Sequence, residues 1–363
     1  MIIFATLSAS LVSCGIVTGD TVMQYGDYKI TEAMYSYWLS SFKSYYLYYY
    51  GETGNYEALW DQTLPDGRTY LQFFEDFVAS YSRKVLICMK LFDDHGVSFP
   101  KEKRAEIEER IDELIKNYGG KAELNAYLGE YGLNIKTLER IYYEEAKVDV
   151  VSDYLFARGG ELELTDAERQ AYYESNYYCV NWIYIYTEQK PDTESGGKGA
   201  NAHYNMIELS DEEKAQKKQL VADILARLQA GESFGELKAK YCEQKNEDGT
   251  SDYDYLPNGF NLCANSYSDG YGAELIKVIQ GMQTGEYATY TDKYATRIIV
   301  RNPLTEYKEL TPQEINFMVD FESYAVGDKL DRHIEGIAGV KINTEVADRY
   351  RDIKAVKTID MSI

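Results

Sequence analysis

Residues 225–237 read LARLQAGESFGEL, and this stretch decides the fold. Leu225 and Leu228 are three positions apart, as on one face of a helix. Gly231 follows them, and glycine is favoured just after the end of a helix. Ser233 then precedes a second apolar run and has a glutamate three residues later, which is the pattern of a capped helix start. The stretch therefore predicts two consecutive helices, a long one over 210–231 and a short one over 233–242.

Strands are predicted on both sides of this helix pair. Residues 179–186 (CVNWIYIY) combine β-branched and aromatic side chains and are too few for a buried helix, so they predict a central strand. The segment 188–205 holds a proline and several glycines and predicts a loop. The elements that follow the helix pair are polar turns over 244–259, a helix at 271–280, and strands at 286–291 and 294–301. Together they give a βααβαββ-like order, which is typical of a small α/β domain.

Helices dominate the rest of the chain. Apolar residues recur every three or four positions, as at Ile107, Ile111 and Leu114, in segments without internal proline. A short strand over 26–31 precedes them and ends at Thr31, a residue type that favours the position before a helix. The predicted helices cover 31–50, 68–94, 101–117, 121–129, 134–157, 165–176 and 311–338. We therefore predict an α+β protein.

Composition excludes several classes of function. Acidic residues outnumber basic ones, 60 against 38, and the formal net charge of −22 disfavours binding to nucleic acid or anionic lipid. The sequence holds no CxxC pair, no cysteine–histidine spacing that suits zinc and no nucleophile motif near its three histidines. We therefore predict no metal, no cofactor and no triad hydrolase. Cys242 and Cys263 form one conceivable disulfide, and free buried cysteines are the open alternative.

The N-terminus predicts an exported, lipid-anchored protein. Residues 1–13 are apolar or small and are fewer than the roughly 20 that span a bilayer as a helix. They end in LVSC at 11–14, the form of a lipobox that is cut before a cysteine carrying diacylglycerol. No lysine or arginine precedes Cys14, so the charged start of a signal peptide is missing. We interpret 1–14 as a lipoprotein signal peptide with lipidated Cys14, which anchors the protein to the cell membrane outside the cytoplasm. The alternatives are an ordinary signal peptide with a core cysteine, and a cytosolic chain.

The order of elements resembles the extracytoplasmic foldase lipoproteins and periplasmic chaperones that carry a parvulin-type peptidyl-prolyl isomerase domain. The stretch 225–237 is close to this family's pattern of helix, glycine, Ser/Asp-Phe and Glu-Leu. Gly285-Glu286 resembles the family's turn before a strand, and Ile298-Ile299-Val300 resembles its final strand. The resemblance implies three parts: a helical SurA-N-like chaperone domain over 20–176, a parvulin-like domain over 177–303, and a C-terminal helix and tail over 304–363 that pack on the helical domain.

The resemblance also implies an isomerase site with two facing histidines, an acid or cysteine beside them and an apolar pocket for proline. In this chain Trp182 and Arg297 occupy the two histidine positions, and the acid or cysteine position falls near Glu243 or Gln244, of which Glu243 is the candidate. Leu262 and Leu275 are the candidate pocket residues. Two interpretations are open. In the first, Trp182 holds a proline ring and Arg297 binds an amide carbonyl of the substrate. In the second, the isomerase fold is degenerate and Trp182 only fills space in the core.

Tyrosine is abundant, with 36 in the chain, and five of them end the first predicted helix at positions 45, 46, 48, 49 and 50. At helical spacing Tyr45 and Tyr49 share one face, and Tyr46 and Tyr50 share an adjacent one. A packed helix interface is one explanation. Because five neighbouring rings cannot all face one core, some are expected at the surface, where tyrosine binds unfolded polypeptide through apolar contact and hydrogen bonds. Tyr46, Tyr49 and Tyr50 are the candidate substrate-binding residues.

These features lead to the hypothesis of a membrane-anchored extracytoplasmic folding factor, a chaperone whose partners are unfolded or newly exported polypeptides. The parvulin-like domain would contribute binding or slow prolyl isomerisation, as the resemblance implies. The alternative hypothesis is a non-catalytic binding or assembly lipoprotein that holds one specific folded partner.

Overall fold

The computed structural model divides the chain into two compact units, one inserted into the other. Residues Met1–Glu163 and Val326–Ile363 form the first, here named the helical unit, and Leu164–Ala325 form the second, named the sheet unit. The structure describes residues 19–51, 55–64, 67–192, 206–245, 249–250, 254, 256, 258–264, 273–318, 320–359 and 361. Cys14 and the predicted signal peptide lie outside these residues. The predicted α+β class is confirmed, with a helical part built from both ends of the chain.

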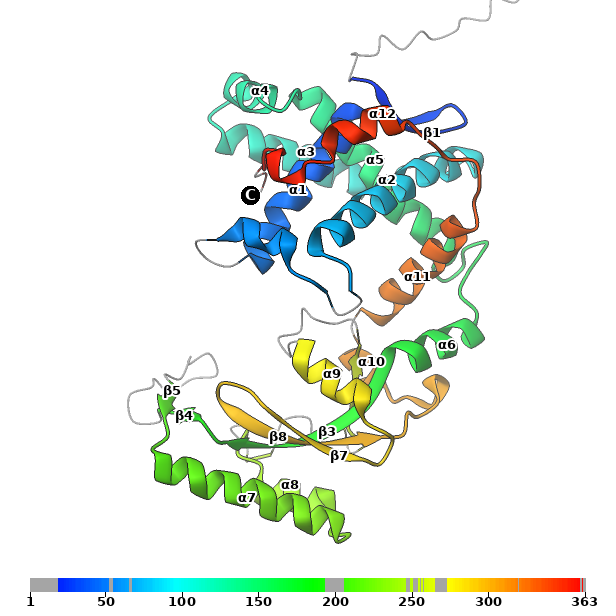
Figure 1. Cartoon of the computed structure of the whole chain (residues 1–363). Helices are drawn as coiled ribbons and strands as arrows, with labels where there is room; N and C mark the ends of the chain where they lie inside the picture. The colour runs from blue at the N-terminus through cyan, green and yellow to red at the C-terminus, as the bar shows by residue number, and fades with distance from the viewer. Residues whose placement is uncertain are drawn as a thin grey trace, which may run out of the picture. The chain divides into compact units, whose positions relative to one another are not determined.

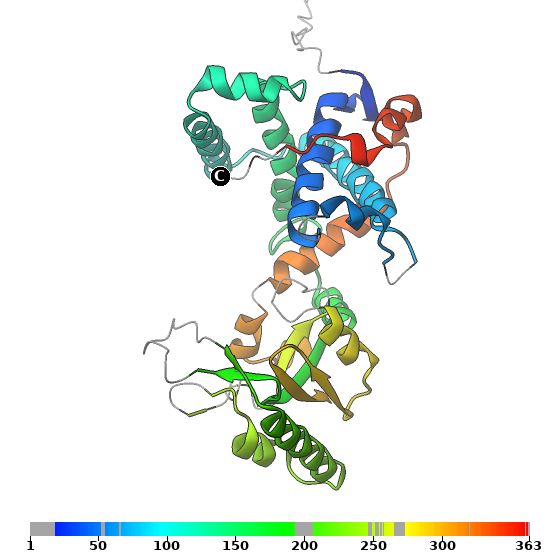
Figure 2. The same ribbon diagram turned by 60° about the vertical axis from the view of Figure 1, so that its left-hand side comes forward.

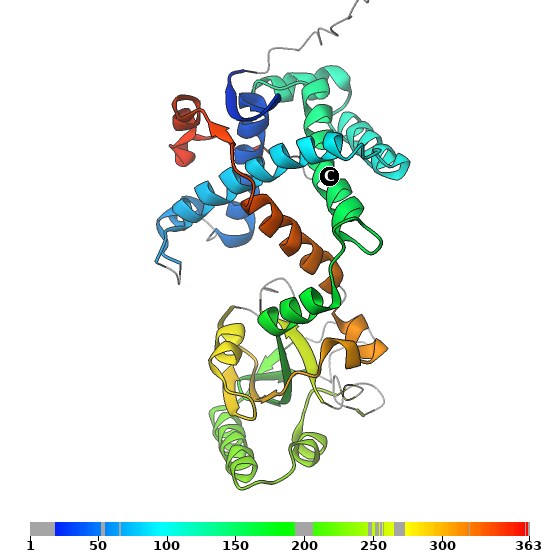
Figure 3. The same ribbon diagram turned by 90° about the vertical axis from the view of Figure 1, so that its right-hand side faces the viewer.

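The helical unit follows from its capping residues and apolar faces. Its main helices are α1 (Glu32–Tyr50), α2 (Tyr70–Asp94), α3 (Lys101–Asn117), α4 (Lys121–Gly129) and α5 (Ile135–Phe156). Thr31 caps α1 by accepting a hydrogen bond from the Met34 amide, and Thr69 forms a capping box at the start of α2. The long helix α2 crosses α5 (Figure 3). Leu114 and Ile141 are among the buried side chains that join the helices into one core.

The C-terminal segment completes the helical unit. Strand β1 (Thr21–Tyr25) lies between β2 (Tyr28–Thr31) and β9 (Lys341–Ile342), and both pairings are antiparallel. The buried Lys43 of α1 donates to the carbonyl oxygens of Lys354 and Val356, at 3.0 Å each. The tail therefore lies along α1 (Figures 1 and 2). It also includes α12 (Thr344–Ala347) and the short 3-10 turns η4 (Asp348–Tyr350) and η5 (Ile353–Ala355), and the turn η1 (Tyr56–Asp61) lies after α1.

The last predicted helix, 311–338, is interrupted. The structure contains α10 (Pro312–Phe317) and α11 (Phe321–Glu335), because Met318 leaves the helical region with φ −92° and ψ 56°. The break lets Phe317 pack on Phe260, at 5.3 Å between ring centroids, while Phe321 stacks on Tyr307 at 4.6 Å. A continuous helix would hold the two rings in one fixed relation, so their packing on different partners opposes it.

The sheet unit contains a four-stranded antiparallel sheet in the order β6-β3-β8-β7. Helices α7 and α8 lie along one side of it and α9 on the other (Figure 1). Central strand β3 is therefore buried along most of its length. The elements of the unit are α6 (Asp166–Asn176), β3 (Tyr177–Tyr186), β4 (Gln189–Pro191), β5 (Met206–Glu208), α7 (Asp211–Gln229), α8 (Phe234–Tyr241), β6 (Phe260–Cys263), α9 (Ala273–Gly281), β7 (Tyr287–Thr291), β8 (Ala295–Asn302), η3 (Tyr307–Glu309) and α10.

The stretch 225–237 forms the predicted helix–turn–helix. Gly231 adopts φ +91°, a conformation that strains residues with a side chain. This conformation ends α7 and turns the chain toward α8. Ser233 then accepts a hydrogen bond from the Glu236 amide and caps α8. Leu228 and Leu237 are buried in the core of the sheet unit, so the stretch both turns the chain and covers the sheet.

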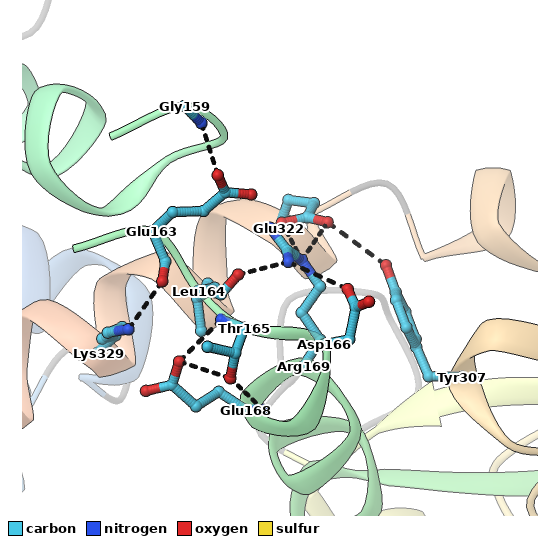
Figure 4. Close-up of polar contacts among 10 residues, drawn as sticks. All are labelled: Gly159, Glu163, Leu164, Thr165, Asp166, Glu168, Arg169, Tyr307, Glu322 and Lys329. Atoms are coloured by element: carbon cyan, nitrogen blue, oxygen red, sulfur yellow. Dashed lines mark hydrogen bonds and ion pairs between the residues drawn. The ribbon is translucent and has the colours of Figure 1, made fainter. Parts of the chain in front are cut away.

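A buried arginine joins the two ends of the sheet unit (Figure 4). Arg169 of α6 is 2% exposed, and its Nε lies 3.0 and 3.2 Å from the two carboxylate oxygens of Glu322 in α11. Its Nη1 donates to the carbonyl of Leu164 at 2.6 Å, and Tyr307 donates to Glu322 at 3.5 Å. One guanidinium thus binds both Leu164, the first residue of the sheet unit, and Glu322 in the first turn of α11, where the unit ends. We call this cluster the arginine clamp.

Among the described residues, no helix is both long and apolar enough to cross a bilayer.

We expect Glu322→Ala to lower the free energy of unfolding of the sheet unit by about 3 kcal/mol, because the buried guanidinium loses its nearest carboxylate and keeps only the exposed Asp166, 3.6 Å from its Nη1 atom. Arg169→Met should cost less, about 1–2 kcal/mol, since the side chain of Glu322 is 41% exposed and water can solvate it. The double variant should be more stable than Glu322→Ala alone. Hydrogen exchange of the β3 amides in rising urea measures all three values. Additive losses would contradict a clamp in which the two side chains depend on each other.

Candidate functional site

Strand alternation brings Trp182 and Arg297 to one face of the sheet. Tyr184 of β3 lies opposite Arg297 of β8, and Trp182 is two residues before Tyr184, so all three side chains share that face. The Arg297 guanidinium carbon lies 4.9 Å from the centre of the Tyr184 ring and 5.4 Å from the Trp182 ring. These are cation–π distances. The family resemblance implied that Trp182 and Arg297 face each other on neighbouring strands, and the structure places them on the paired strands β3 and β8.

Arg297 is also paired with a carboxylate. Its Nη1 lies 2.5 Å from the Oδ2 atom of Asp292, and the Asp292 Oδ1 atom accepts from the amides of Tyr294 and Ala295 at 2.8 and 2.9 Å. Burial alone would raise the pKa of Asp292, but the hydrogen bonds from Arg297 and the two amides outweigh it and hold that pKa below its ordinary value. Arg297 Nε is buried, and no acceptor for it is found among the described residues. The positive charge of Arg297 is thus neutralised inside the unit.

The candidate proline pocket is closed by its own packing. Trp182 is 4% exposed and meets Phe260 edge-on with ring centroids 4.6 Å apart, while Leu262 and Leu275 are buried. A proline ring needs open apolar surface, and these side chains offer almost none. As placed here, Trp182, Leu262 and Leu275 are core residues of the sheet unit.

Glu243 lies at the end of β3 and is bound there by other groups. Its amide donates to the Tyr184 carbonyl at 2.8 Å, and its Oε2 atom accepts from the Tyr186 amide at 2.8 Å. Its Oε1 atom forms an ion pair with Lys217 of α7. The carboxylate therefore fastens α7 to β3, and no contact with Trp182 or Arg297 is found in the described part of the chain. Catalytic roles for Trp182, Arg297 and Glu243 stay predictions.

Cys242 and Cys263 are both free and buried, so the structure favours the free-thiol alternative over a disulfide. The Sγ atom of Cys242 accepts from the Tyr184 amide at 3.5 Å. Over the described ranges, no group of three or more His, Cys, Asp or Glu side chains is arranged to hold a metal ion.

The tyrosines at the end of α1 form an exposed aromatic surface on the helical unit. Tyr48 is 79% exposed and Tyr49 is 62% exposed, and Tyr45 and Tyr50 are exposed as well. Tyr46 is half-buried and packs against Phe74, with ring centroids 5.4 Å apart. The candidate Tyr46 is thus largely a core contact, whereas Tyr49 and Tyr50 are accessible.

A hollow of about 480 Å³ lies beside these rings, and we name it the tyrosine hollow. It is lined by Ser41, Ser44, Tyr45, Tyr48, Tyr49, Arg110, Ile359 and Met361. Tyr45 and Tyr48 were not among the candidate binding residues. Helical spacing pairs Tyr45 with Tyr49, so it could have identified Tyr45. The contribution of Ile359 and Met361 carries no local sequence signal, because it depends on the return of the C-terminal tail.

No protein-family model matches the chain, and no curated protein matches it. Among solved structures, the chain is similar to PrsA from Bacillus subtilis, with 13% identity over 80% of this chain and 96% of that one and a TM-score of 0.26. It is also similar to the foldase protein PrsA from Streptococcus pneumoniae, with 16% identity, coverages of 74% and 85% and a TM-score of 0.24. A third similar structure is a peptidylprolyl isomerase (PrsA) from Bacillus cereus, with 14% identity over 81% of this chain and 97% of that one and a TM-score of 0.25.

We expect Trp182→Ala to lower the free energy of unfolding of the sheet unit by about 3–5 kcal/mol, as for a buried tryptophan. The unaltered protein should accelerate cis–trans exchange of an X-Pro peptide weakly at most, measured by NMR exchange spectroscopy. Trp182→Phe, which keeps an aromatic ring in the core, is the control. Clear acceleration that disappears in Trp182→Phe would contradict a purely structural Trp182.

Proposed function

We propose that this protein is an extracytoplasmic folding factor that holds unfolded polypeptides on its helical unit. The observation that carries the proposal is the exposed tyrosine surface of α1 beside the tyrosine hollow. Exposed rings of this size are costly to leave in water unless they meet a partner. Tyrosine suits an unfolded chain because its ring gives apolar contact and its hydroxyl takes or gives hydrogen bonds with whatever backbone is presented.

The mode of binding that we propose is weak and multivalent. Neighbouring rings such as Tyr45 and Tyr49, 4.5 Å apart, and Tyr48 and Tyr49, 5.0 Å apart, offer several similar contacts to one flexible segment. Many small contacts bind diverse sequences and still release them. The net charge of −22 keeps the protein soluble while its client is bound.

Prolyl isomerisation is at most a minor activity in this proposal. The residues at the family's site positions are buried or engaged in ion pairs, and this supports a role for the sheet unit in architecture or binding. A protein dedicated to one folded partner is the second hypothesis. It differs in stoichiometry, because it would bind one partner saturably and leave unrelated unfolded chains unbound.

The membrane anchor is part of the proposal. The sequence LVSC at 11–14 supports lipidation of Cys14, which would hold the folding factor near the site where secreted chains emerge.

We expect Tyr48→Ser combined with Tyr49→Ser to weaken binding of a reduced, permanently unfolded protein about tenfold, because each lost aromatic contact is worth about 0.5–1.5 kcal/mol. Suppression of client aggregation, followed by light scattering, should fall in parallel. Tyr154→Ser is the matched control, since Tyr154 is 50% exposed on α5 and does not line the tyrosine hollow.

Equal activity of the double variant and the unaltered protein would overturn the tyrosine surface as the binding site. Binding to a single folded protein with one-to-one stoichiometry, and to no unfolded chain, would favour the second hypothesis.

We expect Cys14→Ser to move the protein from the membrane fraction to the soluble fraction of cells, because the variant has no thiol at position 14 to carry diacylglycerol. Immunoblots of the two fractions measure this. Unchanged membrane retention would refute lipid anchoring at Cys14.

A further inference from the structure

A second hollow of about 360 Å³ lies between α2, α3 and α5 of the helical unit. Tyr81, Arg110, Tyr142 and Glu145 line it, and Arg110 also lines the tyrosine hollow. The two hollows therefore share Arg110 as a lining residue. We name this second site the Glu145 pocket.

The carboxylate of Glu145 is held in place by neutral donors. Its Oε1 atom accepts from Trp38 Nε1 at 2.5 Å and from the Tyr81 hydroxyl at 3.4 Å. Within the described part of the chain, its Oε2 atom has no donor and neither oxygen has a lysine or arginine within 4 Å. Glu145 is only partly buried, because the pocket leaves it open on one side. The carboxylate is thus fixed, accessible and without a cationic partner in contact.

The charges around the pocket leave an excess of one negative charge when Glu145 is ionised. Lys103 and Glu106 neutralise each other at 2.9 Å, and Arg110 lies over the Tyr142 ring at 4.3 Å. The one remaining cation of the lining, Arg110, is thus left with two carboxylates, those of Glu145 and Asp149. Burial raises the pKa of Glu145 to about 7, since the hydrogen bonds from Trp38 and Tyr81 and the charge of Arg110 do not offset it. The pocket therefore lacks one cation.

We propose that the Glu145 pocket takes the ammonium group of a lysine side chain in the bound polypeptide. The inference rests on the proposed function and adds a preference to it. An ammonium donates to the open Oε2 atom and lies among aromatic rings, which favour cations. Its methylene stem suits the apolar part of the lining, which includes Ile107 and Ala146. An acidic side chain would meet Glu145 and Asp149, and an apolar one would leave the carboxylate unpaired.

Binding of lysine should depend on pH. The ammonium stabilises ionised Glu145, so affinity should rise as Glu145 loses its proton between pH 6 and pH 8, while the lysine itself stays charged. The other titratable or charged groups that face this carboxylate are Tyr37 from α1, Tyr81 from α2, Lys103, Glu106 and Arg110 from α3, and Tyr142 and Asp149 from α5. Apart from Glu145, the pKa of each side-chain type here ordinarily lies outside that range.

The test compares two aromatic-rich peptides that differ only in one residue, lysine or the uncharged norleucine. Fluorescence anisotropy at pH 8 should show about tenfold tighter binding of the lysine peptide, and less than twofold at pH 6. Glu145→Gln should remove the preference at both pH values, since its amide oxygen still accepts from Trp38 but carries no charge. Glu109→Gln, on the exposed side of α3, makes the same chemical change outside the pocket and should keep the preference.

Equal binding of the two peptides at both pH values would overturn the lysine pocket and leave the proposed function standing. Binding of neither peptide would instead count against the proposed function. In that case n-butylammonium alone decides on the pocket: it should lower the pKa of Glu145, measured by carbon-13 NMR against Glu145→Gln. An unchanged pKa would overturn the inference.

Discussion

The sheet unit is inserted into the helical unit along the chain, so its two ends must lie close together. The arginine clamp holds them there. Arg169 binds the carbonyl of Leu164, where the sheet unit begins, and the carboxylate of Glu322 in the helix where it ends. A guanidinium suits this position because its fixed planar donors can serve a carbonyl and a carboxylate at once, which a lysine ammonium does less well. The guanidinium is buried, which strengthens its bonds to both partners, although the side chain of Glu322 is itself partly exposed.

The insertion also separates the two chain segments that build the helical unit. They meet again through the pairing of β1 with β9 and through Lys43, which binds two carbonyls of the C-terminal tail. Ile359 and Met361 from this tail line the tyrosine hollow. The proposed binding surface is therefore complete only when the first helix and the last described residues of the chain have assembled. A partly folded molecule would lack this surface, which ties binding to the integrity of the whole unit.

Periodicity and capping predicted most of the long elements, because local sequence determines them. Thr31, Ser210 and Ser233 all cap the helices expected from them. Short strands such as β1, β6 and β9 were missed or unassigned, since two to five residues carry little pattern and form only through distant partners. For the site, the family resemblance implied that Trp182 and Arg297 lie on neighbouring strands, but burial of Trp182 depends on Phe260. The surroundings of Glu145 come from α1, α2, α3 and α5, so no local motif could indicate them.

The contrast between two charged side chains supports polypeptide binding over catalysis. Arg297 in the sheet unit is neutralised by Asp292 and covered by two rings, so a ligand would have to displace contacts that the fold already makes. Glu145 in the helical unit has two neutral donors and open space beside it. A ligand gains most where a fixed polar group lacks its strongest partner, because pairing then costs little reorganisation. By this argument the polar cluster of the sheet unit contributes to stability, whereas the helical unit offers the better site for the proposed ligand.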